Sequence, residues 1–290
     1  MRWISLWMLV VAPHLAASDW QQLLDPQLSQ WDTYLSYRHQ PGYQGDIPKD
    51  AQGQPIAPIG LNTGNDRFKV FTVQQQQGEP VLRVSGEIYG ALTSKQQYRN
   101  YHLSLQFRWG ELKWPPRLQL LKDSGILYHA VGEHGKEYWR SWMLSQEFQI
   151  MQGHTGDYWS QASSAIDIRA FLPESIMNAV ADERQPFLAV GAGEKNQGFV
   201  LRKDNHELPD GQWNTLELIC FEGQSLHIVN GQVVMVLRNS RYRDEQGQVQ
   251  PLMQGKLQLQ SEAAEVFYRR IQLKSLSRLP AQYQALFSEG

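Results

Sequence analysis

The chain has little that could cross-link or anchor it. It contains a single cysteine in 290 residues, Cys220, so no internal disulfide can form and stability must come from a buried core. Cys220 lies among alternating apolar residues without an activating group nearby, which favours a small buried side chain over a nucleophile. Charged residues make up only 19% of the sequence, and 27 Lys and Arg against 29 Asp and Glu give a net charge of −2. Because there is no basic excess, we expect no nucleic-acid partner.

Long apolar runs are lacking except near the N-terminus. Residues 1–18 begin with Arg2, continue with a short apolar run and end in small residues, which is the pattern of a secretory signal peptide. The run is too short to span a bilayer, so we expect no stable membrane insertion after the signal has been removed. We therefore expect a periplasmic or secreted protein in which residues 19–290 form a single domain.

Short apolar alternations are plentiful after a loop rich in Gly, Pro, Asn and Asp. Ten segments show a two-residue period: FKVFTVQ, EPVLRVSG, IYGALTSK, YHLSLQFRWG, GILYHAVG, SQEFQIMQG, WNTLELICFEG, SLHIVNGQVVMVLRN, GKLQLQSEA and EVFYRRIQLKSL. Turn-forming residues separate them, which predicts an all-β antiparallel sandwich with loop insertions. Asn230-Gly231 is a favoured two-residue hairpin turn. The less periodic segment 162–207 is expected to be an insertion with a short helix at residues 173–183.

Several motifs, in their order along the chain, resemble those of a known family. They are GEIYGALTSKQQYRNYHLSLQFRW, DSGILYH, SQEFQI, GQWNTLELICFEGQSLHIVNGQ and GKLQLQSEAAEVFYRRIQL. Between about Leu23 and Leu276 the chain resembles the 3-keto-disaccharide hydrolases, also described as 3-keto-glucoside 1,2-lyase and 3-keto-2-hydroxy-glucal hydratase domains. The resemblance implies a concanavalin A-like sandwich (jelly roll). It also implies an enzyme that cleaves 3-keto-glycosides by elimination and hydration, or by hydrolysis.

One polar strand supplies the first candidate site residues. Alternate side chains of a strand share a face, so in QEFQIM Phe148 and Ile150 point one way and Glu147 and Gln149 the other. The apolar pair belongs in the core. We therefore expect Glu147 and Gln149 on an open face that a ligand can reach.

Two further strands carry polar groups in the same pattern. Gln260 and Glu262 share a face of GKLQLQSE, and His129 shares a face with Leu127 in GILYHAV. If these strands are neighbours, Glu147, His129 and Glu262 converge on one groove. The reaction implied by the resemblance needs a base for the C2 hydrogen, a group that stabilises the enolate and an acid near the leaving oxygen. We expect Glu147 or His129 to be the base and Glu262 to be the acid.

Binding candidates surround the polar strand. Arg140, Tyr158 or a bound cation would stabilise developing negative charge. Trp142 and Trp159 would either stack on a sugar ring or cap the core at a sheet edge. The predicted substrate-binding residues are Gln149, Arg140, Trp142, His154, Asp157, Tyr158, Trp159 and Gln260.

The sequence predicts no organic cofactor and leaves a divalent metal possible. His154 and Asp157 in GHTGDYW would bind a metal with other histidines and acids, or would fix their loop through hydrogen bonds. Their spacing matches no tight ligand signature. The expected ligand is a small molecule or an oligosaccharide. The alternative from a different class is a carbohydrate-binding sandwich protein that uses the same cleft without turnover.

Overall fold

The computed structural model describes residues 19–41, 47–136 and 141–288. The predicted signal peptide and the predicted binding residue Arg140 lie outside these described residues. Strands dominate the described chain, whose helices are α1 (Asn65–Phe68) and the 3-10 helix η1 (Ala281–Phe287). The predicted all-β fold is therefore confirmed. None of the described helices has the length and apolar character needed to cross a membrane.

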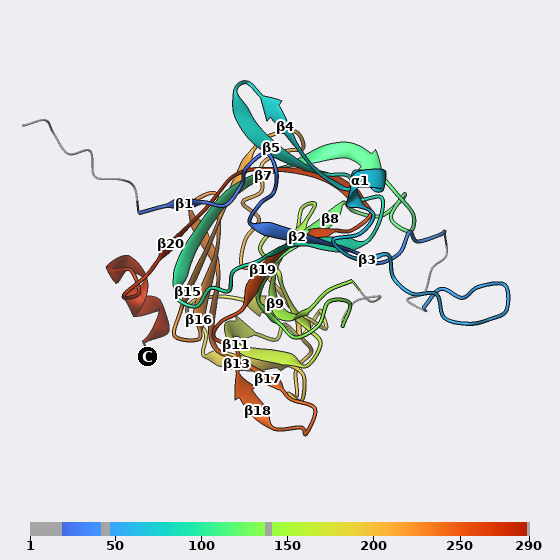
Figure 1. The fold of residues 1–290 in the computed structure, drawn as a ribbon. Coiled ribbons are helices and arrows are strands. Elements are labelled where there is room, and N and C mark those ends of the chain that lie inside the picture. The colour runs from blue at the N-terminus through green and yellow to red at the C-terminus, as the bar shows by residue number, and fades with distance from the viewer. Residues whose placement is uncertain (1–18, 42–46, 137–140, 289–290) are drawn as a thin grey trace, which may run out of the picture.

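The strands form two layers that pack face to face (Figure 1). The first layer has the order β4-β5-β20-β7-β15-β16-β17-β11-β13, with β1 beside β20 and β18 beside β17. Its strands are β1 (Gln21–Gln22), β4 (Phe71–Gln76), β5 (Glu79–Val84), β7 (Tyr101–Lys113), β11 (Ser164–Phe171), β13 (Phe187–Gly191), β15 (Asn214–Phe221), β16 (Gln224–Val229), β17 (Gln232–Arg243), β18 (Val249–Pro251) and β20 (Ala264–Ser275).

The second layer has the order β3-β2-β6-β19-β8-β9-β10-β14-β12 and joins the first layer where β12 pairs with β11. Its strands are β2 (Trp31–Leu35), β3 (Gly60–Leu61), β6 (Gly90–Ser94), β8 (Asp123–Val131), β9 (Leu144–Met151), β10 (Tyr158–Gln161), β12 (Ala179–Ala181), β14 (Phe199–Leu201) and β19 (Lys256–Ser261). Among the described strand pairs, β12 and β14 are parallel and the others are antiparallel. The architecture is the predicted antiparallel sandwich.

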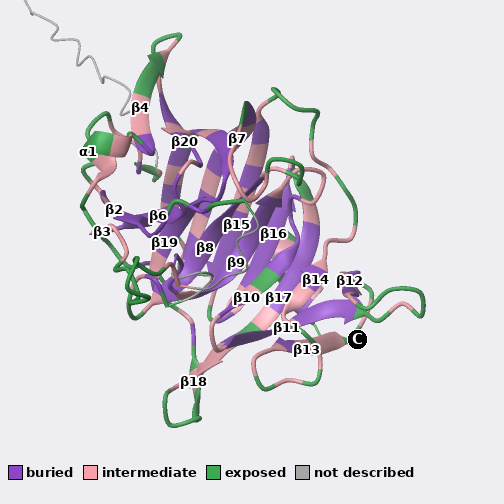
Figure 2. Ribbon diagram, turned by 90° about the vertical axis from the view of Figure 1, so that its right-hand side faces the viewer, coloured by how far each residue is buried: buried purple, intermediate pink, exposed green. Residues whose placement is uncertain are grey.

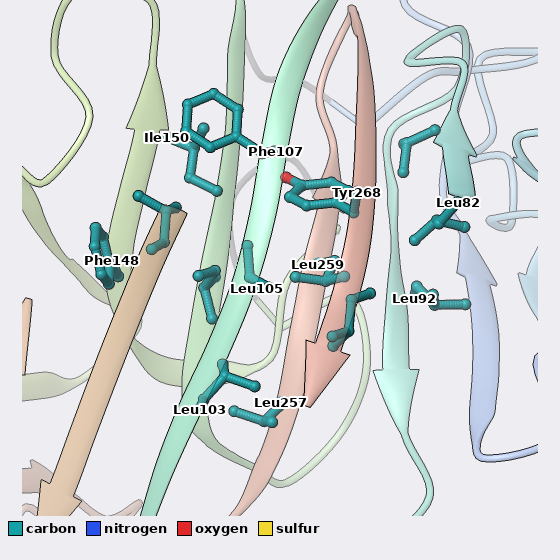
Figure 3. Packing of buried hydrophobic residues seen from close by; sticks show 14 of the residues in the cluster. Leu82, Leu92, Leu103, Leu105, Phe107, Phe148, Ile150, Leu257, Leu259 and Tyr268 are labelled. Atoms are coloured by element: carbon teal, nitrogen blue, oxygen red, sulfur yellow. The ribbon is translucent and has the colours of Figure 1, made fainter. Parts of the chain in front are cut away.

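Apolar side chains of both layers meet between them (Figure 3). Leu105 and Phe107 of β7 come from the first layer, and Phe148, Ile150 and Leu259 come from β9 and β19 of the second. All five side chains are almost fully buried. The alternation of QEFQIM therefore places its apolar pair in the core as predicted, and its polar pair faces the other way.

The turns and the insertion test two further predictions. Asn230 and Gly231 both have positive φ, 48° and 80°, as the predicted hairpin turn between β16 and β17 requires. Each of the ten alternating segments contains a strand. The predicted helix at 173–183 is wrong, because Ala179–Ala181 instead forms β12, paired with β11 and β14. Pairing with two neighbouring strands overrides the weak local helix preference.

Candidate functional site

The candidate site lies on the face of the second layer that points away from the core. There β19, β8, β9 and β10 lie side by side (Figure 2). Glu147 is opposite both Leu127 of β8 and Trp159 of β10, and Gln149 is opposite Gly125. Since residues opposite one another in paired strands share a face, the polar side chains of three strands converge over Gly125.

A cavity of about 380 Å³ occupies this face. It is lined by Arg117, Asp123, Trp142, Glu147, Gln149, Met151, Trp159, Ser160, Gln161, Gln260 and Glu262. Gly125 explains its depth, because a Cβ at this position would lie 2.4 Å from Gln260 Oε1 and 2.5 Å from Glu147 Oε1. Only a glycine allows these two side chains to approach the strand backbone so closely.

Arg117 joins two acids on one wall of the cavity. Its Nη2 contacts Asp123 Oδ2 and lies 2.8 Å from Glu262 Oε1, and Asp123 and Glu262 form a β-bridge across their strands. Burial opposes the charge of the guanidinium, but Glu262 and Asp123 outweigh this effect and raise the pKa of Arg117. Arg117 is therefore a permanent cation held inside the cavity by two carboxyl groups.

Glu147 is the third acid and the most strongly defined by its surroundings. Its side chain is buried, with 2% of the residue exposed, and Gln161 Nε2 donates a hydrogen bond of 2.5 Å to its Oε2. Burial and the charge of Glu262 raise the pKa of Glu147 to about 8. Its carboxylate is consequently a much stronger base than that of an exposed glutamate.

The acids of the Arg117 wall are also shifted. Burial and the charge of Glu262 raise the pKa of Asp123 against the effect of Arg117, and burial raises the pKa of Glu262 against the same cation. Three carboxyl groups thus lie near one guanidinium, which contacts Asp123 and Glu262 directly. Such a cluster retains protons near neutral pH and can exchange them with a bound molecule.

Several polar atoms of the cavity have no hydrogen-bond partner within the described chain. They are Asp123 Oδ1, Arg117 Nε and Gln260 Oε1. A buried polar group without a partner costs about 1–3 kcal/mol, so native proteins leave few of them. A polar ligand bound in this cavity would supply partners for these three atoms.

Six of the predicted site residues come together here, namely Glu147, Gln149, Trp142, Trp159, Gln260 and Glu262. Trp142 is buried and also packs with Tyr89 and Leu127, so it forms a fixed wall. Trp159 is 37% exposed. Their catalytic and binding roles stay predictions at this point.

His129 does not belong to the groove, and this part of the prediction is wrong. A β-bulge between Tyr128 and Val131 and a φ of 54° at His129 break the alternation on which the prediction relied. The ring is buried in the core against Tyr101, and its Nδ1 lies 3.0 Å from the carbonyl oxygen of Leu252. Burial lowers the pKa of His129 to about 4, so the ring is neutral at physiological pH.

His154, Asp157 and Tyr158 also lie outside the cavity. Asp157 is fully buried and accepts hydrogen bonds from the backbone N–H and Nη1 of Arg202, at 2.8 and 3.0 Å. His154 Nδ1 lies 3.2 Å from Asp157 Oδ2. Tyr158 is buried on the opposite face of β10 and donates to Gln146 Oε1. These contacts fit the loop-fixing alternative for His154 and Asp157, not ligand binding.

A metal centre was the remaining alternative for these histidines and acids. Within the described part of the chain, no group of three or more His, Cys, Asp and Glu residues is arranged to hold a metal ion. His154 is paired with Asp157, whereas the ring of His134 stacks on Tyr34, so the histidines are dispersed. The possible divalent metal stays a prediction.

The sequence did not predict Arg117, Asp123, Gly125 or Gln161 as residues of this cavity. Strand alternation could have identified Gln161, because its side chain lies on the same face of β10 as that of Trp159. Arg117 follows Trp-Pro-Pro in an aperiodic loop, and no local pattern connects it with acids on other strands.

The chain belongs to the family described as 3-keto-alpha-glucoside-1,2-lyase-like domains, which matches residues 19–274. The predicted resemblance is therefore confirmed, and membership places the chain among carbohydrate-active proteins. No curated protein matches the sequence significantly.

Solved structures with similar folds are distant. A candidate glycosyl hydrolase from Parabacteroides distasonis is 16% identical, with a TM-score of 0.45 over 89% of this chain and 99% of its own. A non-specific endo-β-1,3(4)-glucanase of family GH16 is 11% identical, with a TM-score of 0.42 over 91% and 95%. A Bacillus subtilis carbohydrate-binding module of family 66 is 7% identical, with a TM-score of 0.38 over 71% and 92%. Catalytic and non-catalytic proteins both occur among them.

Proposed function

We propose that this protein is an enzyme that cleaves 3-keto-glycosides by eliminating the group at C1 and hydrating the product. The observation that carries the proposal is the cavity in which Glu147, Asp123 and Glu262 surround a single cation, Arg117, in a chain of this family. Elimination needs a base and an acid in the same pocket, and groups with raised pKa values suit both roles near neutral pH.

In the proposed reaction the Glu147 carboxylate removes the C2 hydrogen, which the neighbouring C3 ketone acidifies. The electron pair of the C–H bond forms the enolate, and its return to the ring expels the C1 oxygen. Glu262, or Asp123 beside it, supplies the proton that the leaving oxygen takes up. Arg117, together with the amide of Gln260, interacts with the developing negative charge. Water then adds to the double bond to give the 3-keto sugar.

The raised pKa of Glu147 has two consequences for this role. At neutral pH only about a tenth of the molecules carry the ionised base, because the pKa is about 8. That carboxylate is correspondingly more basic, which favours abstraction of a weakly acidic carbon-bound hydrogen. Turnover is therefore expected to rise with pH up to about 8.

The direct test is incubation of the purified protein with 3-keto-glucosides and with their unoxidised parents, with and without a chelator, while release of the aglycone is followed. Release from the keto substrates alone supports elimination. Release from the parents as well would instead indicate ordinary hydrolysis by a carboxylate pair. Loss of release in the chelator would show that a metal is required.

A carbohydrate-binding protein without turnover is the outcome that would replace this proposal. It predicts no release from any substrate, together with thermal stabilisation by the same sugars. The buried acids favour turnover over binding alone, since a protein that only stacks on a sugar does not need carboxyl groups with raised pKa values.

We also propose that the protein acts after export, on the basis of the signal-like residues 1–18. Mass spectrometry of the protein recovered from periplasm and medium tests this idea. A mature N-terminus at Ser18 or Asp19 supports export, and a chain that retains Met1 inside the cell contradicts it.

A further inference from the structure

The acid cavity opens beside Trp159. Among its described lining residues Trp159 is the one that is exposed, at 37%, whereas Arg117, Met151 and Ser160 are half-buried and the others are buried. The Trp159 ring is therefore part of the cavity mouth, where it can contact a group attached to a sugar held over Glu147.

Trp159 belongs to a stacked aromatic pair. Its ring lies 4.1 Å from that of Phe199, at 15° between the planes, and the two residues are opposite one another in the antiparallel pair β10–β14. The strands approach closely at this point, because a Cβ at Gly198 would lie 1.7 Å from Ser160 Oγ. The glycine thus allows the flat pair to form at the edge of the cavity.

Phe199 also lines a second cavity of about 250 Å³. The other lining residues are Leu172, Met177, Ala179, Lys195, Asn196 and Gln197. Leu172 is 53% exposed and Met177 is 85% exposed, so both present apolar surface to a molecule bound in this cavity. Trp159 lines the acid cavity and Phe199 lines the second cavity, so the stacked pair links the two linings.

We propose that the second cavity binds the leaving group of the substrate, and that this group is a planar aromatic aglycone and not a second sugar. The inference rests on the proposed function of the acid cavity, because it assumes a sugar bound there. Trp159 and Phe199 provide flat contact surface, and Leu172 and Met177 provide apolar contacts that adapt to the shape of the ring.

The chemistry of the lining favours an aromatic group over a sugar. Lys195, Asn196 and Gln197 offer partners to a few hydroxyl groups of a second sugar, whereas the hydroxyl groups placed against Leu172, Met177 and Phe199 would lose water without gaining partners. A phenolic ring has few polar atoms. Lys195 and Gln197 can donate hydrogen bonds to its oxygens.

The test compares two 3-keto-glucosides, one with an aryl aglycone and one with a methyl group, in wild type and in Met177→Ser. Val249→Ser is the matched control, because Val249 is 52% exposed on β18 and lines neither cavity. We expect Met177→Ser to lower kcat/KM for the aryl substrate by about tenfold, mainly through KM, and to leave the methyl substrate within about twofold. Equal effects on both substrates, or no effect on either, would overturn the inference.

A binding measurement separates this inference from the proposed function. If wild type releases nothing from any keto substrate, the proposed function fails. Binding of the unoxidised aryl glucoside, measured by calorimetry, then tests the second cavity independently of turnover. Binding that Met177→Ser weakens and Val249→Ser does not would keep the aglycone site. Binding that is absent, or equal in all three proteins, would overturn it.

Discussion

Two buried carboxylate clusters in this protein differ in one decisive respect. Asp157 is fully buried, yet both of its oxygens have partners in Arg202 and His154. In the acid cavity Arg117 is shared between Asp123 and Glu262, and Asp123 Oδ1 has no partner in the described chain. Both carboxylate oxygens of Asp157 are thus paired, whereas Asp123 keeps an unpaired oxygen and faces an open cavity.

The comparison distinguishes a buried carboxylate that stabilises the fold from a buried carboxyl group that can act on a ligand. A carboxylate that is paired and fully hydrogen-bonded fixes a turn, and removing one partner leaves the other charge buried without compensation. A carboxyl that is buried with excess negative charge around it has a raised pKa, and it becomes useful when a ligand arrives. Burial of an acid alone would therefore not have identified the site.

The strongest way to test the contrast is Glu147→Gln. The amide is nearly isosteric but can neither take up nor release the substrate proton, so we expect turnover of a 3-keto-glucoside to fall by about 10³-fold. Below pH 4.5, where Glu147 holds its proton in the folded and the unfolded state, the free energy of unfolding should change by less than about 1 kcal/mol, as for a substitution without a change of volume. Initial rates and urea denaturation measure the two effects.

Glu217→Gln is the control for that experiment, since Glu217 is a partly buried acid that binds His102 outside the cavity. It should retain turnover. If Glu147→Gln keeps most of the wild-type rate, or if both variants lose it equally, Glu147 is not the base.

Asp157→Ala should have the opposite effects, a loss of stability with little change in turnover. It leaves the guanidinium of Arg202, whose side chain is 12% exposed, without its acid, so we expect a loss of about 3 kcal/mol in the free energy of unfolding. The rate per folded molecule should be nearly unchanged. Urea denaturation with parallel rate measurements checks this, and His154→Ala, which removes a more exposed partner, should cost less. Lost turnover in a stable variant would assign Asp157 to the site instead.

Much of the fold could be predicted because it depends on local patterns. Strand alternation identified the core side of β9, and Asn230-Gly231 identified a hairpin. The insertion was misread at Ala179–Ala181, because its strand character comes from pairing with β11 and β14 and not from its own sequence.

The site was only partly predictable for the same reason. Glu147 and Glu262 followed from alternation, but His129 did not, because a bulge shifts its side chain to the other face. Arg117 lies in a loop, and its pairing with Asp123 and Glu262 depends on strand order. Strand order is a property of the whole sheet, which alternation within one strand does not reveal.

Gly125→Ala sharpens the comparison with a smaller change. The added methyl group would lie 2.5 Å from Glu147 Oε1 and 2.4 Å from Gln260 Oε1, so both side chains must move. We expect turnover to fall by about tenfold to a hundredfold because the base is misplaced, with a loss of about 1–2 kcal/mol in stability. The matched control is Gly132→Ala, where a Cβ would meet nothing within 4 Å, although its φ of 80° adds backbone strain. Equal losses of turnover in the two variants would show that stability, and not the position of Glu147, limits activity.

The remaining test concerns the way in which stability depends on pH. The pKa of Glu147 is about 8 in the folded protein and near 4.5 when unfolded, so between these values the folded state holds a proton that the unfolded state has lost. The stability associated with this proton is fully present below pH 4.5 and is lost as the pH rises through about 8. Buried His39, His129 and His227 act in the opposite direction below their ordinary pKa of 6.5, because burial lowers their pKa values to about 4, 4 and 3.

Since Glu147→Gln retains these histidines, the difference between its free energy of unfolding and that of wild type isolates the glutamate. The variant should lose less stability than wild type as the pH rises from 4.5 to about 8. Urea denaturation of both proteins across this range measures the difference. Parallel curves would mean that Glu147 titrates like an exposed acid, and the acid cavity would then differ from the Asp157 cluster in its partners but not in the basicity that the proposed reaction requires.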